Sequence, residues 1–317
     1  SCNDDDPTSL NPAGKPDSTF DSGTGFEGEV TSLAIQPDGK VIAAGWFRSY
    51  NSQALSSLVR LHKDGALDNS FVQAGTGLDP DRAYFRPALA IEPNGKIVVG
   101  GIFADFHGTA IHGIMRLNND GTLDPSFDTG AGFDHGIEKV LIQPDGKILV
   151  VGFFHSYDGI SRHRIVRINN DGTPDLTFDA GNWLCAISAL ALQPDGKIVI
   201  GGTQDTPSGI ENSLARLNSD GSLDSSFDRP EIGSCSANAI AIQPDGKIIT
   251  IGNYKSNDGT DNYNIARYKD DGKPDPSFII GAGFGSHYYP FELQLQTDGK
   301  ILIGGSFNFF DDMARNS

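Results

Sequence analysis

A five-residue motif recurs six times along the chain at a nearly constant spacing, and this repeat limits the folds that the sequence can adopt. Its glycines follow one another at intervals of 56, 51, 50, 50 and 53 residues. The six copies are Gln36–Lys40, Glu92–Lys96, Gln143–Lys147, Gln193–Lys197, Gln243–Lys247 and Gln296–Lys300. A period of about 50 residues is typical of repeat architectures in which each unit is one supersecondary element. We therefore expect six similar structural units.

Each copy of the motif lies between two apolar runs, such as Leu33–Ile35 before the first copy and Ile97–Gly101 after the second. Within the motif, Pro presets φ for a turn, Asp can hydrogen-bond its own backbone, and Gly accepts a positive φ. Two β-branched runs around such a turn predict a β-hairpin with a three-residue loop and a glycine bulge.

A second hairpin signal follows about 20 residues after each of the first five motifs and reads Arg-x-x-x-Asp-Gly, then Asp-x-Ser-Phe or a near variant. If its loop also has three residues, the arginine lies opposite the second aspartate. The predicted pairs are Arg60 with Asp68, Arg116 with Asp124, Arg167 with Asp175, Arg216 with Asp224, and Arg267 with Asp275. These repeated charges are interpreted as structural.

Four short strands in about 50 residues, with no helical period shared between units, predict an all-β fold, a β-propeller of four-stranded antiparallel blades. Residues 10–317 are expected to form one propeller domain. The segment Leu10–Phe20 matches only the last part of a unit, so an N-terminal strand is expected to complete the last blade and close the ring. Six blades are predicted. Seven remain the alternative, because Phe307–Ser317 stops before a third strand.

The whole pattern, including a kelch-like Gly100-Gly101 doublet after the second strand, resembles the bacterial delta-60 repeat family. The resemblance extends from about Leu10 to Ser317. It implies a β-propeller fold and no particular reaction, since no activity is settled for that family.

Charge excludes one class of partner. The chain has 24 Lys and Arg against 41 Asp and Glu, a net charge of −17, and its basic residues are spread thinly. Such a chain repels phosphate backbones, so nucleic acid is not an expected partner. No run of 18 apolar residues occurs, so no membrane-spanning helix is expected.

The N-terminus, Ser1-Cys2 followed by Asn3–Asp6, resembles the mature start of Bacteroidota surface lipoproteins. The resemblance implies that Cys2 carries a lipid anchor, that residues 1–9 are a tether, and that the protein is held at the outer membrane on the cell surface. The alternative is a solvated acidic terminus with an incidental cysteine. The other two cysteines, Cys185 and Cys235, occupy equivalent places in consecutive units. The sequence leaves open whether they form a disulfide or are two buried free thiols.

Antiparallel strands place both kinds of glycine turn on one face of the ring, which we call the turn face. The opposite face, the loop face, holds the blade loops between second and third strands and the connecting loops between units. The turns of the turn face are nearly identical from unit to unit, whereas the loops of the loop face differ in length and in aromatic content. Candidate contacts with a ligand or partner lie on the loop face: Tyr84, His135, Trp183, Tyr288 and Tyr289. The alternative is that these rings plug the channel.

No catalytic, cofactor or metal motif is recognised. His107, His112, His155 and His163 fall on blade loops without a His-x-x-x-His or Cys/His pairing, so no metal site is predicted. The Asp-Gly turns lack the bidentate glutamate of a calcium loop. No nucleophile elbow and no phosphate-binding glycine loop occurs.

The sequence thus favours a non-enzymatic platform that binds a protein partner, such as an outer-membrane component, or a glycan through its loop face. The alternative is a glycoside hydrolase or lyase with its site at the channel mouth. Two converging carboxylates with perturbed pKa values would distinguish the enzyme.

Overall fold

The computed structural model describes residues 17–55, 57–71, 87–206, 209–228, 237–252, 265–279, 284, 289–306, 309–310 and 313–314. In this part of the chain all regular structure is β, as expected, and no helix is long and apolar enough to cross a membrane.

Antiparallel strands recur in the same order in each unit. The first strands are β1 (Phe26–Ile35), β5 (Ala88–Ile91), β10 (Ile137–Ile142), β15 (Leu184–Leu192), β18 (Ala237–Ile242) and β21 (Tyr289–Leu295). The second strands are β2 (Val41–Tyr50), β6 (Ile97–Gly100), β11 (Ile148–Gly152), β16 (Ile198–Thr206), β19 (Ile248–Gly252) and β22 (Ile301–Ser306). The third strands are β4 (Leu58–Leu61), β9 (Ile114–Leu117), β14 (Ile165–Ile168), β17 (Gly209–Leu217) and β20 (Ile265–Tyr268).

The first-hairpin prediction is confirmed. In the third unit, the Gln143 N–H donates to the Lys147 carbonyl at 2.8 Å, which closes a loop of three residues between β10 and β11. Gly146, the last loop residue, has φ = +82°, a conformation that is strained for any residue with a Cβ atom. The sequence motif therefore sets the register of the first two strands.

The fourth strand is shorter than predicted. Each third strand forms a single further bridge, such as Leu117 with Leu123, and the sheets of units two to five contain three regular strands. The chain then turns away, because Asp124 Oδ1 accepts the N–H and the hydroxyl of Ser126 at 3.0 and 2.7 Å. An aspartate that hydrogen-bonds two residues ahead favours a turn over continued pairing. The predicted fourth strand is therefore mainly a turn.

The blade loops contain small hairpins that the sequence analysis did not predict. They comprise β3 (Gln53–Ala54), which pairs with the end of β2, and three two-stranded hairpins: β7 (Asp105–Phe106) with β8 (Thr109–Ala110), β12 (Ser156–Tyr157) with β13 (Ile160–Ser161), and β23 (Phe309–Phe310) with β24 (Met313–Ala314). These hairpins extend the blades on the loop face.

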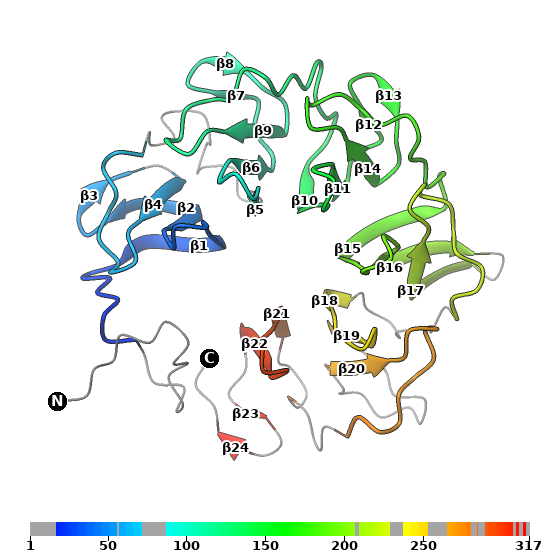
Figure 1. The fold of residues 1–317 in the computed structure, drawn as a ribbon. Coiled ribbons are helices and arrows are strands. Elements are labelled where there is room, and N and C mark those ends of the chain that lie inside the picture. Colours follow the sequence, from blue (N-terminus) through cyan, green and yellow to red (C-terminus); the bar gives the residue numbers. More distant parts are fainter. Residues whose placement is uncertain are drawn as a thin grey trace.

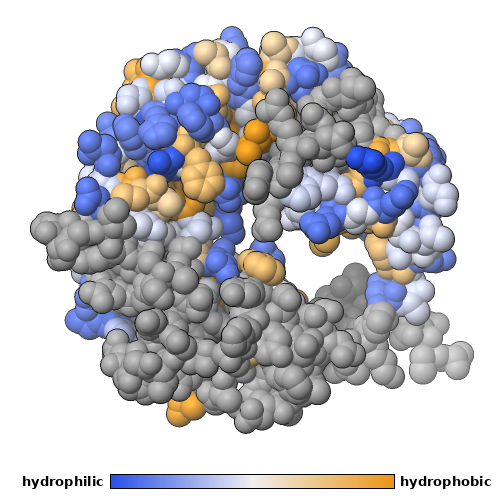
Figure 2. Space-filling view, turned by 180° about the vertical axis from the view of Figure 1, so that it is seen from behind, coloured by the Kyte–Doolittle hydropathy of each residue, from blue (hydrophilic) through white to orange (hydrophobic). Residues whose placement is uncertain are grey.

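Figure 1 shows the sheets arranged around a central axis, with the first strands innermost, and Figure 2 shows the opening at the centre of the ring. Apolar clusters join neighbouring blades. Leu89 and Ile91 of β5, for example, pack with Ile42 and Ala44 of β2. Burying a Leu or Ile side chain stabilises a fold by roughly 1.5–3 kcal/mol, so these repeated contacts are the main cohesion between blades.

Ring closure stays a prediction, together with the number of blades. Leu33 and Ile35, the first-blade equivalents of Leu89 and Ile91, are 64% and 71% exposed. They point to where a preceding blade would pack, and in a closed ring that is the last blade. Deletion of residues 1–22 followed by a thermal melt would test closure.

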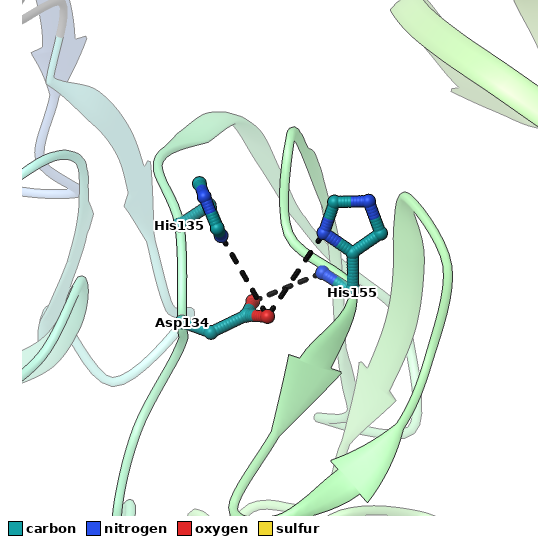
Figure 3. A group of neighbouring side chains, drawn as sticks. All are labelled: Asp134, His135 and His155. Atoms are coloured by element: carbon teal, nitrogen blue, oxygen red, sulfur yellow. Dashed lines mark hydrogen bonds and ion pairs between the residues drawn. The ribbon is translucent and has the colours of Figure 1, made fainter.

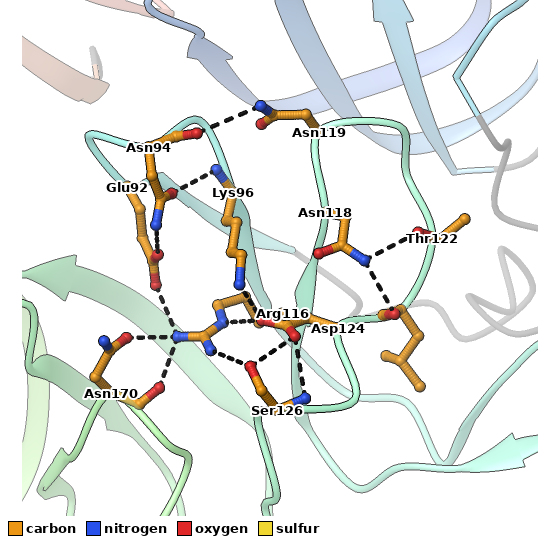
Figure 4. Close-up of polar contacts among 11 residues, drawn as sticks. Glu92, Asn94, Lys96, Arg116, Asn118, Asn119, Thr122, Asp124, Ser126 and Asn170 are labelled. Carbon is orange, nitrogen blue, oxygen red and sulfur yellow. Dashed lines mark hydrogen bonds and ion pairs between the residues drawn. The ribbon is translucent and has the colours of Figure 1, made fainter.

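The five predicted Arg–Asp pairs are confirmed, and the first four are buried. In the second blade, Arg116 and Asp124 are 3% and 4% exposed, and Arg116 Nε donates to Asp124 Oδ2 at 2.6 Å. Lys96, from the first turn of the same blade, donates to the same oxygen at 2.8 Å. The guanidinium lies 4.8 Å from the ring centroid of Phe127. Figure 4 shows Arg116, Asp124 and Lys96.

The same arginines also join neighbouring blades. Arg116 Nη1 donates to the carbonyl and side-chain oxygens of Asn170, in the next blade, at 2.7 and 2.6 Å (Figure 4). Arg60, Arg167 and Arg216 make the equivalent bond to Asn119, Ser219 and Asp270. Each guanidinium therefore holds its own hairpin and the turn of the next blade together.

The ring interior is polar where the first strands approach. Lys139 of β10 donates from Nζ to the Asn238 carbonyl of β18 at 3.2 Å, which links the third blade to the fifth. Burial lowers the pKa of Lys139, and the nearby carboxylate Glu292 opposes that shift. A lysine thus crosses the channel in the described part of the chain.

Candidate functional site

An aromatic cluster fixes the loop face of the third blade. Phe133, in the connecting loop, stacks against Phe154 and Tyr157 of the blade loop with centroid distances of 4.6 and 4.4 Å. Phe154 and Tyr157 are fully buried, and Phe133 is 7% exposed. The two loops therefore pack as one unit on an apolar base.

Backbone hydrogen bonds lock the same two loops together. The N–H of Phe153 donates to the Gly136 carbonyl at 2.9 Å, and the N–H of Asp158 donates to the Gly132 carbonyl at 2.9 Å. Because Phe133 and Phe154 point inward, the residues that follow them, Asp134 and His155, are exposed on the loop face.

Asp134 is held in a defined orientation. Its Oδ1 accepts the backbone N–H groups of His155 and Ser156 at 2.9 and 3.1 Å. Partial burial alone would raise the pKa of Asp134, but these two donors and the nearby His135 hold it below its usual range. The carboxylate is therefore ionised at neutral pH.

Two imidazoles face the other carboxylate oxygen, as Figure 3 shows. Nδ1 of His135 lies 3.6 Å from Asp134 Oδ2, and Nδ1 of His155 lies 4.0 Å from it. Potential ligand atoms of the three residues all lie within 4.8 Å of one another. A further imidazole, His163, lies 5.6 Å from His155 between ring centroids. The site can offer a metal ion one oxygen and two nitrogens.

Apolar side chains flank this group. Ile102, at the end of the second blade's second strand, lies so close to Gly136 that a Cβ there would be 2.6 Å from its Cγ1. Phe153 occupies the equivalent place in the third blade, and both side chains are exposed, 38% for Ile102 and 50% for Phe153. Figure 2 shows apolar residues gathered in patches among polar ones around the opening of the ring. Both exposed apolar residues therefore adjoin Gly136, which follows His135 in the chain.

The repeat carries a family signature over most of the chain. Residues 36–71, 92–127, 143–178, 193–227, 243–278 and 296–315 match the family described as "Domain of unknown function (DUF5122) beta-propeller". The chain belongs to this family. The first five matched segments each span the two glycine turns of a unit and the arginine between them, and the sixth contains the first turn alone.

Several solved structures are similar to the chain. Hydrazine synthase of Kuenenia stuttgartiensis is similar to the chain with a TM-score of 0.50 and 17% identity, over 90% of this chain and 77% of that one. PorZ, a surface component of the type-IX secretion system of Porphyromonas gingivalis, gives 0.48 and 15%, over 91% and 40%. An endo-1,4-beta-xylanase of Bacteroides thetaiotaomicron gives 0.35 and 11%, over 89% and 96%. These similarities concern the fold alone. No curated protein matches the chain.

Among the predicted contact residues of this DUF5122 propeller, the structure places His135 in the exposed group described above. Trp183 is only half exposed: its Nε1 donates to the Ala180 carbonyl at 2.6 Å, and its ring packs against the cluster between the third and fourth blades. The side chain of Tyr289 and all of Tyr84 and Tyr288 lie outside the described residues.

The cysteine predictions stay open. Cys185 is half-buried on β15, and Cys235 lies outside the described residues. The same holds for Cys2 and the rest of the proposed tether. The disulfide and the lipid anchor therefore stay predictions.

Sequence reasoning did not join Asp134 and His155, because they lie 21 residues apart on two loops with no shared motif. One signal was available. Phe133 and Phe154 align with Phe26 and Phe47 of the first unit, and this shared pattern is the signal from which a meeting of the residues that follow them could have been inferred.

Proposed function

We propose that this propeller is a non-enzymatic binding platform and that its loop face, at the third blade, holds a protein partner. The observation that carries the proposal is that two exposed apolar side chains, Ile102 and Phe153, both adjoin Gly136, the residue after His135. Exposed apolar side chains that lie together on a rigid base favour partner contact, and interfaces are enriched in aromatic residues.

The arrangement of the two faces supports the same conclusion. The turn face repeats nearly the same residues in each blade and uses them for bonds within and between blades. Substitutions on the loop face leave those bonds intact, so that face is free to vary with the partner. A rigid scaffold that carries variable loops is a common design for recognition.

A glycoside hydrolase or lyase finds less support in the chemistry of this chain. Its general acid needs a carboxyl group with a raised pKa. In the described residues, every carboxyl whose pKa departs from its ordinary value has a lowered pKa, most strongly in the Arg–Asp pairs. We propose no catalytic site.

The proposal includes location at the cell surface through a lipid on Cys2, with an outer-membrane protein as the partner. Its support is the Ser1-Cys2 start and the acidic run that follows. Metabolic labelling with a fatty acid tests the anchor: the label should enter the native protein and be absent from the Cys2→Ser variant.

A pull-down from outer-membrane extracts of the native bacterium tests partner binding. Immobilised chain should recover a protein in constant proportion, and a variant with Ile102→Ser and Phe153→Ser should recover at least about tenfold less, since losing two interface contacts costs 1.4 kcal/mol or more. A further variant with Ala at Trp183, Tyr84, Tyr288 and Tyr289 tests the other predicted contacts.

The matched control is Leu176→Ser, which changes an exposed leucine near the turn face. It should recover the partner like the unmodified chain. Equal recovery by folded Ile102/Phe153 and control variants contradicts the proposal. Recovery that survives digestion of the extract with protease identifies a glycan in place of a protein.

A further inference from the structure

We propose that Asp134, His135 and His155 bind a divalent transition-metal ion of the Zn²⁺ class on the loop face of the third blade. This inference goes beyond partner binding, because it assigns an inorganic ligand to three named side chains.

The geometry is close to that of a bound site. Ligand atoms held at about 2.0–2.2 Å from one tetrahedral Zn²⁺ lie about 3.3–3.6 Å apart. Here Nδ1 of His135 and Nδ1 of His155 lie 3.6 and 4.0 Å from Asp134 Oδ2 (Figure 3). Small rotations of exposed imidazoles are enough to reach those separations.

The group is also prepared for a cation. Two backbone N–H groups fix Asp134 Oδ1, so Oδ2 keeps its lone pairs toward the imidazoles. The loops beneath are held by the buried rings of Phe133, Phe154 and Tyr157. Little ordering of the backbone and of the Asp134 side chain is therefore left for metal binding. The net charge of −17 further raises the local concentration of cations.

The ligand types select the metal. Imidazole nitrogen suits Zn²⁺, Ni²⁺ and Cu²⁺, whereas Mg²⁺ and Ca²⁺ prefer oxygen ligands only. Three protein ligands leave at least one coordination position open for water or for a donor group of a bound molecule. Such a position faces the solvent, since the His135 and His155 side chains are 61% and 49% exposed.

The first blade provides an internal comparison. Phe26 stacks with Phe47 and Tyr50 at 4.5 and 4.6 Å, in the same arrangement as the third-blade cluster. The exposed residues that follow Phe26 and Phe47 are Glu27 and Arg48, a carboxylate and a guanidinium. A guanidinium cannot bind a cation, so the shared scaffold carries the donor set in the third blade and not in the first.

Calorimetric titration of the metal-free, untagged chain with Zn²⁺ tests the proposal. We expect one equivalent to bind, little competition from Mg²⁺, and at least about 100-fold weaker binding by His135→Asn/His155→Asn, since loss of an outer-shell partner alone costs 10–100-fold. His112→Asn removes an exposed histidine of the second blade and should bind Zn²⁺ like the unmodified chain.

Asp134→Asn provides a second, milder variant, because the amide oxygen can still accept the two N–H groups while the charge is lost. It should fold normally by circular dichroism and bind Zn²⁺ at least about tenfold more weakly. Absence of a saturable site, or equal affinity in the unmodified chain and in the folded Asp134→Asn variant, overturns the proposal. A loss in His112→Asn as large as in the double variant overturns it as well.

Discussion

The turn face and the loop face of the propeller are joined by the same strands but use their polar residues differently. On the turn face, Arg116 and Asp124 are nearly fully buried and each has several partners. On the loop face, Asp134, His135 and His155 are exposed and lie around one point. Charged groups that pair with each other stabilise the fold, whereas polar groups that converge with lone pairs toward one point are available to bind a ligand.

The Arg–Asp pairs of the turn face also differ from blade to blade. Arg267 of the fifth blade pairs with Asp275 at 2.9 Å, as in the other blades, but its side chain is 17% exposed. In the described residues it makes no bond to a following blade, and Lys247 bonds Asp245 in preference to Asp275, at 2.8 against 4.0 Å. The arginine makes its bond between blades where the next unit has a second glycine turn, as in the first four blades.

The largest expected loss of stability comes from removing the buried Arg116–Asp124 pair. Arg116→Ala leaves Asp124 and the turn carbonyl of Asn170 without the guanidinium, so we expect the free energy of unfolding to fall by about 3–5 kcal/mol. Urea denaturation followed by circular dichroism measures it. A fall within the error of the unmodified chain would show that the pair does not hold the blades.

Arg267→Ala is the matched comparison for that variant. It removes the same pair without a described bond between blades, so the loss should be less than half of that of Arg116→Ala, because fewer buried partners remain unsatisfied. Equal losses would mean that the bond to the next blade adds nothing.

Acid should weaken the turn face. Burial alone would raise the pKa of Asp124, but hydrogen bonds from Lys96, Ser126 and Arg116 hold it well below its ordinary value of 3.8. The pKa values of Asp68 and Asp175 are lowered in the same way. A lowered folded-state pKa contributes stability above the unfolded value, which is lost as pH falls through the folded one. We expect stability to be steady near neutrality and to fall below about pH 4.

Urea denaturation at several pH values measures this loss, and Asp124→Asn should fall less steeply with acid than the unmodified chain. Stability that stays level down to pH 3 would contradict a role for these carboxylates.

The smallest expected change in stability comes from a substitution on the loop face. Asp134→Asn keeps the acceptor for both N–H groups, so the free energy of unfolding should change by no more than about 0.5 kcal/mol in metal-free buffer. A loss comparable to that of Arg116→Ala would make the loop-face group structural and would remove the contrast between the faces.

Local sequence was enough to predict the glycine turns, the register of their strands and the Arg–Asp pairs. The residues that close each turn and the paired Arg and Asp lie within ten residues of each other, and Pro, Asp and Gly restrict the backbone directly, as Gly146 does at φ = +82°. Even locally, the turn after Asp124 competes with strand pairing, and the fourth strand was overestimated for that reason.

Contacts between distant segments could not be predicted, because they depend on how blades pack and how loops fold on each other. Arg116 reaches Asn170 across 54 residues, and Lys139 reaches Asn238 across 99. Asp134 meets His155 only because buried rings beneath them bring two loops together. Side-chain direction and the distance between loops are set by that packing, so the metal-binding geometry emerges in three dimensions from residues that share no motif.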